Sequence, residues 1–258
     1  MKSTETIFGL HAVRILLERH PERVHTVRLA AHREDPRVRA IEELARRHQR
    51  PVQRVDAHAL QQLLGDVVHQ GVAADVAPLP PWSEDELLVA LQSAPAPLLL
   101  ALDGVQDPHN LGACIRSADA CGALAVIVPR DRAAQLTPAV RKVAVGAAET
   151  TPVAAVTNLA RTLKLLKEAG LWVVGADAVG AKPAFGVDLR GPIVLVLGAE
   201  GAGLRRLTRE SCDFLVRLPL LGAVESLNVS VAAGMLLYEA VRQRSLASDA
   251  GVNSGSSP

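Results

Sequence analysis

Residues 193–203 have the sequence Ile-Val-Leu-Val-Leu-Gly-Ala-Glu-Gly-Ala-Gly, an apolar run that ends in a glycine-rich turn. A continuous apolar run of this length is typical of a strand that is buried on both faces of a parallel sheet. The glycines allow a tight turn or a close approach of the backbone to a ligand. Since ligands of open α/β sheets bind beyond the carboxyl ends of the strands, this stretch indicates both the fold and the position of the site.

Similar apolar runs occur on both sides of this stretch and alternate with helical patterns. This alternation is typical of a doubly wound parallel α/β domain. The expected strands are 98–102, 124–128, 171–175, 193–197 and 214–218, and the expected helices are 111–121, 159–169 and 229–244.

The N-terminal part of the chain predicts a separate small α/β unit. Its helical patterns lie at 10–17, 36–47 and 58–64, and its strand patterns at 24–30, 52–55 and 72–76. Five prolines between residues 77 and 97 surround a short amphipathic stretch at 84–91, which indicates a linker with one or two helical turns. The C-terminus is rich in Ser, Gly and Asn and is expected to be disordered. The expected division is 1–78 for the N-terminal domain, 79–97 for the linker, 98–244 for the second domain and 245–258 for the tail.

Composition argues against several classes of protein. The chain has 28 Lys and Arg against 27 Asp and Glu, so no overall cationic field attracts nucleic acid. Three Phe, two Trp and one Tyr argue against recognition of RNA by aromatic base stacking. Three cysteines without a C-x-x-C pair suggest neither a disulfide framework nor a metal site. The apolar runs are short and no signal peptide is apparent, so we expect a soluble cytoplasmic protein with no membrane partner.

Two other expected strand ends are followed by polar segments. The segment after residue 102 contains Asn110 and Arg116, and the segment after residue 218 contains Ser226 and Asn228. Helix capping is an equally simple explanation for the Asn and Ser residues, and an ion pair with Asp119 one turn on explains Arg116. The glycine turn itself lacks the G-x-G-x-x-G spacing of a dinucleotide site, which argues against a nicotinamide dehydrogenase.

The three segments together are more specific than any one of them. Asn110 to Arg116, Gly198-Ala199-Glu200-Gly201 and Ser226-Leu227-Asn228-Val229-Ser230 resemble, in order and spacing, the signature motifs of the SpoU (TrmH-type) RNA 2′-O-methyltransferases. The resemblance covers residues 98–243. Residues 7–13 and 69–72 look like the edges of the ribosomal-protein-like RNA-binding domain of some members. The resemblance therefore implies a trefoil-knotted (SPOUT) methyltransferase domain with a parallel sheet, preceded by a small α/β RNA-binding domain.

The same resemblance implies an activity, a cofactor and partners. We expect a homodimer that uses S-adenosylmethionine to methylate the ribose 2′-hydroxyl of a specific guanosine in 23S rRNA. The residues expected to bind the cofactor are Leu197, Gly198, Gly203, Leu218 and Leu227. The residues expected to carry the reaction are Arg116, which would hold a phosphate and the 2′-oxygen, and Asn110, Glu200, Ser226 and Asn228, which would complete the polar site.

The sequence leaves two alternatives to a 23S rRNA methyltransferase. A tRNA ribose methyltransferase would share the same second domain, and an RNA-binding ribosome-assembly protein without turnover would share the fold. Eleven of the twelve basic residues between 1 and 78 are Arg, whose planar side chain suits phosphate, although an ordinary solvated surface has the same composition. Arg14, Arg46 and Arg47 on expected helices are the candidate phosphate contacts.

Overall fold

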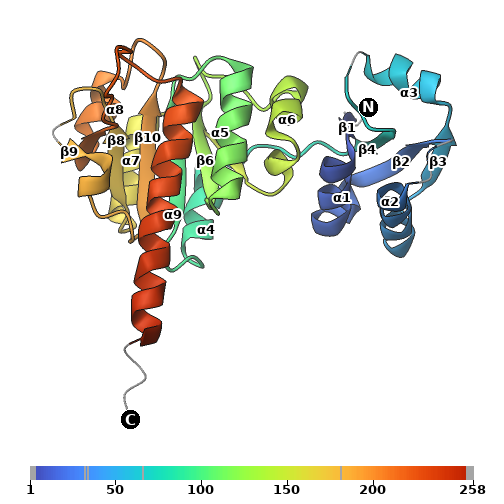
Figure 1. Cartoon of the computed structure of the whole chain (residues 1–258), viewed down its shortest axis with the longest axis horizontal. Helices are drawn as coiled ribbons and strands as arrows, with labels where there is room; N and C mark the ends of the chain where they lie inside the picture. The colour runs from blue at the N-terminus through green and yellow to red at the C-terminus, as the bar shows by residue number, and fades with distance from the viewer. Residues whose placement is uncertain (1–3, 32, 34, 66, 181, 254–258) are drawn as a thin grey trace. The chain divides into compact units, whose positions relative to one another are not determined.

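The computed structural model describes residues 4–31, 33, 35–65, 67–180 and 182–253 (Figure 1). The chain forms two compact units. The first consists of Met1–Pro80 and Thr137–Thr150, and the second of Pro81–Leu136 and Thr151–Pro258. The segment Thr137–Thr150 therefore folds with the N-terminal unit, although the sequence pattern assigns it to the second domain.

The second unit is built on a sheet whose neighbouring strands are all parallel, with the order β7-β6-β5-β10-β8-β11-β9 among the described residues. β10 lies between β5 and β8, so the strand that ends in the glycine turn is central. The doubly wound parallel architecture is confirmed, and the knot stays a prediction from the resemblance. The strands are β5 (Leu98–Asp103), β6 (Ala125–Pro129), β7 (Val153–Val156), β8 (Trp172–Ala176), β9 (Lys182–Pro183), β10 (Ile193–Gly198) and β11 (Phe214–Arg217).

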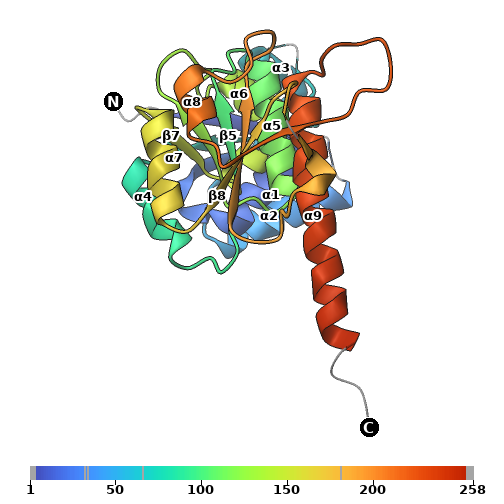
Figure 2. The same ribbon diagram turned by 90° about the vertical axis from the view of Figure 1, so that its left-hand side faces the viewer.

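Helices cover both faces of this sheet (Figure 2). α5 (Pro108–Ala120) and α9 (Val229–Asn253) lie together on one face, and α4 (Glu84–Leu91) and α7 (Leu159–Glu168) lie on the other. Because successive strand residues point to opposite faces, alternate residues of each strand belong to the same core. The core beneath α4 and α7 includes Leu99, Ala101, Ala125, Ile127, Val194 and Val196.

The expected linker is largely structured. Within it, α4 begins with a capping box, in which Ser83 Oγ accepts from the Glu86 backbone N–H and the Glu86 carboxylate accepts from the Ser83 N–H. Leu87 and Leu91 are buried and pack in the core between α4 and the sheet. The helical turns expected at 84–91 are therefore present, and α4 packs as part of the second unit.

Two helix ends also differ from expectation. α5 begins at Pro108, because the Asp107 side chain caps it by accepting from the His109 N–H at 3.0 Å. Asn110 is therefore inside the helix and is not its cap. α9 continues to Asn253, so residues 245–253 are helical where a disordered tail was expected. Leu and Ala in this stretch are good helix formers, and residues 254–258 lie outside the described residues.

The first unit contains a sheet of order β1-β4-β2-β3, with antiparallel β1–β4 and β4–β2 pairs and a parallel β2–β3 pair. The expected strands and helices are confirmed to within two residues at each end, and β1 at the sheet edge was not expected. The elements are β1 (Glu5–Phe8), α1 (Leu10–Arg19), β2 (Val24–Ala30), α2 (Pro36–Arg47), β3 (Val52–Val55), α3 (Ala57–Leu64), β4 (Val72–Val76) and, from the later segment, α6 (Pro138–Ala144).

A buried cluster of charges holds the later segment of this unit. Both oxygens of Glu149 are paired, Oε2 with Arg23 Nη1 at 2.5 Å and Oε1 with Arg141 Nη1 at 2.6 Å. The three side chains are 2%, 9% and 8% exposed, respectively. Arg23 also donates to the Ala77 carbonyl and Arg141 to the Leu79 carbonyl. Buried charges are tolerated in such a cluster because each has a partner, so removal of one member is costly.

Among the helices of the described residues, none is both long and apolar enough to cross a membrane.

The Glu149→Gln substitution tests this charge cluster. It leaves Arg23 and Arg141 buried without their shared counter-charge, so the free energy of opening of the first unit is expected to fall by about 3 kcal/mol. Both tryptophans lie in the second unit, so the measurement is native-state hydrogen exchange at β2 and β4 amides. The exposed Glu43→Gln on α2 is the matched control. Equal exchange in the two variants would contradict a structural role for the cluster.

Candidate functional site

The polar segments that follow β5, β10 and β11 meet at the carboxyl ends of the strands. Glu200 Oε1 accepts hydrogen bonds from Asn228 Nδ2 at 2.7 Å and from Asn110 Nδ2 at 3.3 Å. Asn228 Nδ2 also donates to Asn110 Oδ1 at 2.9 Å. Three residues that are 28 to 118 positions apart in the chain thus form one hydrogen-bonded cluster, as the motif pattern predicts.

The same cluster closes the N-terminus of α9. Asn228 Oδ1 accepts from the Ser230 N–H at 2.9 Å and from Ser230 Oγ at 2.6 Å, so Asn228 is a capping residue. Glu200 Oε1 also lies 3.4 Å from the Val229 nitrogen, where the helix dipole favours a negative charge. Capping does not use the whole side chain of Glu200. Its second oxygen, Oε2, makes no hydrogen bond within the described part of the chain and remains available to a ligand.

The glycine turn is folded tightly on itself. The Gly203 N–H donates to the Ala199 carbonyl and the Ala202 N–H donates to the Glu200 carbonyl, both at 2.9 Å. A Cβ atom on Gly198 would lie 2.0 to 2.4 Å from backbone atoms of Gly203 and Leu204. Since backbone cannot move aside as a flexible side chain does, only glycine fits at position 198. The turn therefore holds Glu200 at a fixed place beyond β10.

The residues expected to bind S-adenosylmethionine surround this turn. Leu197 is buried in β10, so only its backbone can face a ligand, and Leu218 and Leu227 are half-buried. The backbone of residues 218–227 makes no backbone–backbone hydrogen bond with any residue that the structure describes. Free backbone N–H and C=O groups beside half-buried leucines suit an adenine ring, and the Glu200 carboxylate suits a cationic ligand. The residues present thus fit this cofactor.

The structure does not bring Arg116 or Ser226 into the cluster. Arg116 is exposed on α5 and makes no hydrogen bond or ion pair with the described residues. The alternative explanation, an ion pair with Asp119, is wrong, and Asp119 accepts from Thr151 Oγ1 at 3.1 Å. Ser226 is also exposed, in the segment before α9, and makes no hydrogen bond to the described residues. Both side chains are therefore free to contact a substrate.

One residue of the site was missed in the sequence. Asp103, the last residue of β5, is 1% exposed, and its Oδ2 accepts from the Arg205 backbone N–H at 2.8 Å. The Arg205 guanidinium lies 3.5 Å from Oδ1. This contact ties the end of β5 to the segment that follows the glycine turn. The sequence feature that could have identified Asp103 is its position directly after the five apolar residues 98–102.

Thiol and metal chemistry have little support here. Burial raises the pKa of the Cys114 thiol on α5 to about 12, and burial also raises that of Cys212 to about 12, so both are protonated near neutral pH. Within the ranges that the structure describes, no three His, Cys, Asp or Glu side chains are grouped as a metal site would require.

Comparison with known proteins identifies the two parts of the chain separately. Residues 97–238 match the SpoU rRNA methylase family, and residues 6–82 match the RNA 2′-O ribose methyltransferase substrate-binding family.

Full-length relatives are also similar. The 23S rRNA (guanosine-2′-O-)-methyltransferase RlmB of Pseudomonas putida is 53% identical over 95% of this chain and 98% of its own length. That of Escherichia coli K12 is 48% identical over 94% of this chain and 100% of its own length. The crystal structure of the SpoU methyltransferase AviRb from Streptomyces viridochromogenes, in complex with the cofactor AdoMet, has a TM-score of 0.77 at 28% identity. It covers 94% of this chain and 91% of that one.

The Gly198→Ala substitution tests the tight packing of the turn. The added methyl group meets backbone atoms, so the free energy of unfolding of the second unit is expected to fall by about 1–3 kcal/mol. Urea titration followed by tryptophan fluorescence measures it, since both tryptophans are in this unit. The control is Gly222→Ala, where a Cβ meets nothing within 4 Å. Equal stability of the two variants would show that the turn can relax.

Proposed function

The chain belongs to the SpoU rRNA methylase family, and we propose that it transfers a methyl group from S-adenosylmethionine to the ribose 2′-hydroxyl of a guanosine in 23S rRNA. The observation that carries this proposal is that relatives with this activity match the chain along 94 to 95% of its length, both units included. A protein of this activity acts where ribosomal RNA is made, which in a bacterium is the cytoplasm.

The cofactor would be held by the glycine turn and the segment that follows β11. Leu197, Gly198, Gly203, Leu218 and Leu227 offer backbone groups and apolar contact. When bound, S-adenosylmethionine supplies a methyl group that is already activated by the positive charge of its sulfonium. The remaining task of the protein is to hold and activate the 2′-oxygen, a hydroxyl with a very high pKa.

Arg116 is suited to that task as a fixed cation. An arginine stays protonated at neutral pH and is a poor base, so it does not remove the hydroxyl proton itself. Its guanidinium can bind a phosphate of the RNA and stabilise the negative charge that forms on the 2′-oxygen. Since Arg116 has no ion-pair partner among the described residues, no internal contact has to break before it binds the substrate.

The hydrogen-bonded cluster beyond the strands would orient the substrate. Asn228 and Asn110 both donate to Glu200, so the carboxylate is held in one position at the start of α9. A preorganised polar group costs no rearrangement at the moment of reaction. We propose that Glu200 Oε2, Asn110 and the exposed Ser226 contact the ribose or the guanine edge, while Asn228 positions them.

The first unit would bind the RNA outside the reacting nucleotide. Of the three arginines proposed as phosphate contacts, Arg47 is exposed without an ion-pair partner in the described part of the chain. Arg14 and Arg46 form surface ion pairs with Glu18 and Glu42. The exposed pair of Arg14 contributes little stability, so an RNA phosphate can replace the Glu18 carboxylate at small cost. Glu42 is 16% exposed and also pairs with Arg54, so it keeps a counter-charge when Arg46 turns to a phosphate.

We also propose that the active form is a homodimer that pairs through α9. Val231, Met235 and Tyr238 are 50%, 49% and 68% exposed. Their spacing of four and then three residues gathers them on one stripe of the helix, one turn beyond the Asn228 cap. An apolar stripe beside a polar site suits a second copy of the chain, because the interface of a two-fold dimer pairs each surface with itself.

Methyl transfer from radiolabelled S-adenosylmethionine to undermethylated 23S rRNA tests the function. We expect one 2′-O-methylguanosine in 23S rRNA and no label in total tRNA as the parallel substrate. The Arg116→Ala variant should lose at least about 100-fold in rate while its cofactor affinity, measured by calorimetry, stays within about twofold.

Three results would contradict these expectations. Label in tRNA alone would keep the reaction and overturn the substrate. Cofactor binding without label in either RNA would favour a non-catalytic assembly protein. An Arg116→Ala variant as active as the native chain would exclude a role of Arg116 in the mechanism. The Arg116→Lys variant shows whether a positive charge at this position is sufficient for activity.

The dimer is tested by Met235→Glu. A charge on each copy at the centre of the apolar stripe is expected to shift the chain from dimer to monomer in analytical ultracentrifugation, since unpaired charges are not tolerated in an apolar interface. Val89→Glu on α4 is the control, because Val89 is 64% exposed but lies on another helix. A dimer that persists in Met235→Glu would exclude α9 as the interface.

A further inference from the structure

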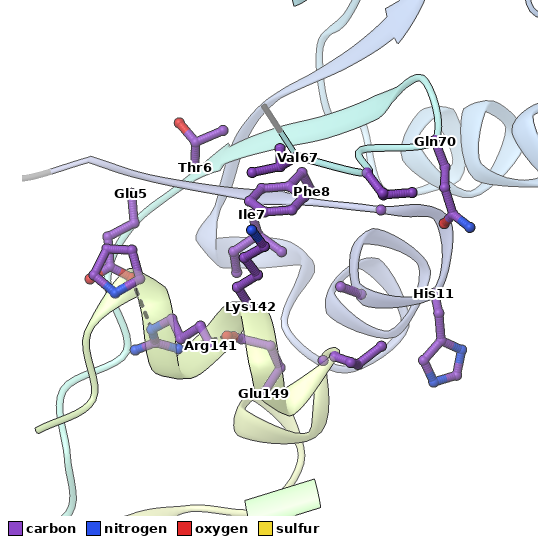
Figure 3. Close-up of a pocket in the computed structure, with 16 residues that line it drawn as sticks. Glu5, Thr6, Ile7, Phe8, His11, Val67, Gln70, Arg141, Lys142 and Glu149 are labelled. Atoms are coloured by element: carbon purple, nitrogen blue, oxygen red, sulfur yellow. Dashed lines mark hydrogen bonds and ion pairs between the residues drawn. The ribbon is translucent and has the colours of Figure 1, made fainter. Parts of the chain in front are cut away.

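The first unit contains a cavity of about 390 Å³ that none of the proposed chemistry uses (Figure 3). β1 and α1 form one wall, and the segment Thr137–Thr150 forms the other. Its size is in the range of pockets that bind small molecules. All lining residues belong to this unit, so the cavity does not depend on the second one.

One wall of the cavity is an unpaired strand edge. β1 is the edge strand of its sheet and, among the described strands, pairs with β4 alone. The Gly9 N–H donates to the Val72 carbonyl at 3.0 Å, and in an antiparallel ladder the residues alternate between facing the partner strand and facing away. By this alternation, Thr6 and Phe8 direct their backbone N–H and C=O groups away from β4. A ligand at this edge meets both hydrogen-bond donors and acceptors.

Among the charged side chains at the cavity, one cation has no ion-pair partner within the described residues. Glu5 lies 3.3 Å from Arg141, and Glu149 is paired with both Arg141 and Arg23. The two carboxylates are therefore matched by two guanidiniums. Lys142 extends from α6 toward β1 and has no ion-pair partner among the described residues (Figure 3). The cavity thus favours an anionic ligand.

The remaining lining combines the polar side chains of Thr6, His11 and Gln70 with an apolar surface, and one of its turns has an unusual backbone. Phe8, Val67 and Val145 contribute the apolar surface, and Phe8 is one of only three Phe in the chain. Val145 has a φ of +53°, a conformation that a β-branched residue rarely adopts, and Gly146 next to it has a φ of +91°. A Cβ on Gly146 would lie 3.1 Å from Ala12 Cα, so this turn is pressed against α1. Strain of this kind persists where the surrounding structure holds it, often at binding sites.

We propose that this cavity binds one unstacked nucleotide of the RNA substrate, other than the nucleotide that is methylated. The base lies against Phe8, its edge hydrogen-bonds to the free backbone of β1, and a flanking phosphate pairs with Lys142. An extended peptide could also add to the edge of β1, but the unmatched Lys142 and the concave shape favour a nucleotide. The inference rests on the proposed function, because it assigns this unit a part of the RNA.

A fluorescein-labelled single-stranded RNA tetranucleotide is the probe, bound to the full chain and measured by anisotropy. Lys142→Glu is expected to weaken binding about tenfold and to lower the slope of log affinity against log salt by about 0.7, the value for one phosphate contact on a single strand. Val67→Trp, which fills the cavity without a change of charge, should weaken binding by a similar factor. Amide shifts of Phe8 and Gly9 in the native chain should locate the probe at β1.

The controls are matched to each variant. Lys164→Glu makes the same charge change at an exposed position on α7, and Leu63→Trp adds the same ring on α3 at a residue that does not line the cavity. Equal losses in Lys142→Glu and Lys164→Glu, or no amide shifts at β1, would overturn the proposal. Tighter binding of an extended peptide to the β1 edge would overturn it in favour of a protein partner.

Methyl transfer to 23S rRNA, measured in parallel, separates the two hypotheses. In one outcome, the native chain methylates 23S rRNA, and Lys142→Glu and Val67→Trp bind the probe as tightly as the native chain does. This outcome would contradict nucleotide binding in the cavity and leave the proposed function intact. In the opposite outcome, the probe binds at β1 but the native chain transfers no methyl group. This outcome would contradict the proposed function and support nucleotide binding in the cavity.

Discussion

The register between β5 and β10 decides where Asn110 and Glu200 lie, the two residues of the cluster that follow these strands. Asp103 is the last residue of β5 and pairs with Gly198, the last residue of β10. The segments that follow the two strands therefore begin at the same edge of the sheet. The segment after β5 enters α5 within a few residues, and the segment after β10 closes into the glycine turn. Asn110 and Glu200 are therefore brought into contact. A shift of this register would separate them, since the close packing at Gly198 leaves the turn no alternative path.

The long elements of the fold could be predicted from sequence because each carries enough apolar residues for a clear period. β5 and β10, each six residues long, are buried almost throughout, and the pattern located them to within one residue. β7 and β9, with four and two residues, gave no such signal. α6 was missed for a related reason, since seven residues show less than two full turns of a period. Its assignment to the first unit depends on contacts far apart in sequence, chiefly Glu149 with Arg23, which no local pattern contains.

The site was predictable to the extent that its residues follow strand ends. Asn110, Glu200 and Asn228 were predicted from the resemblance of three segments to the family motifs, and these segments follow strands whose carboxyl ends meet at one edge of the sheet. Their individual hydrogen bonds were not predictable, and the helix start was misjudged because Asn110 and Asp107 are both good caps. The small number of aromatic residues argued against base stacking anywhere in the chain. The proposed nucleotide site at Phe8 needs only one aromatic side chain, because tertiary structure provides the other walls of the cavity, and a count of aromatic residues does not detect such a site.

The distribution of ion pairs explains how a chain with a net charge of +1 can bind a polyanion. Such a chain has no long-range cationic field, so its affinity for RNA depends on individual cations that are free to make contact. Buried carboxylates of the chain pair with three of its cations, Arg23, Arg141 and Arg205. These three arginines are therefore not available to bind RNA. Arg116 and Lys142, in contrast, have no ion-pair partner within the described part of the chain. Each of these two cations stands beside a proposed binding site, one in each unit, so each is expected to contact a phosphate. The buried pairs of Arg23 and Arg141 with Glu149 instead hold the fold together.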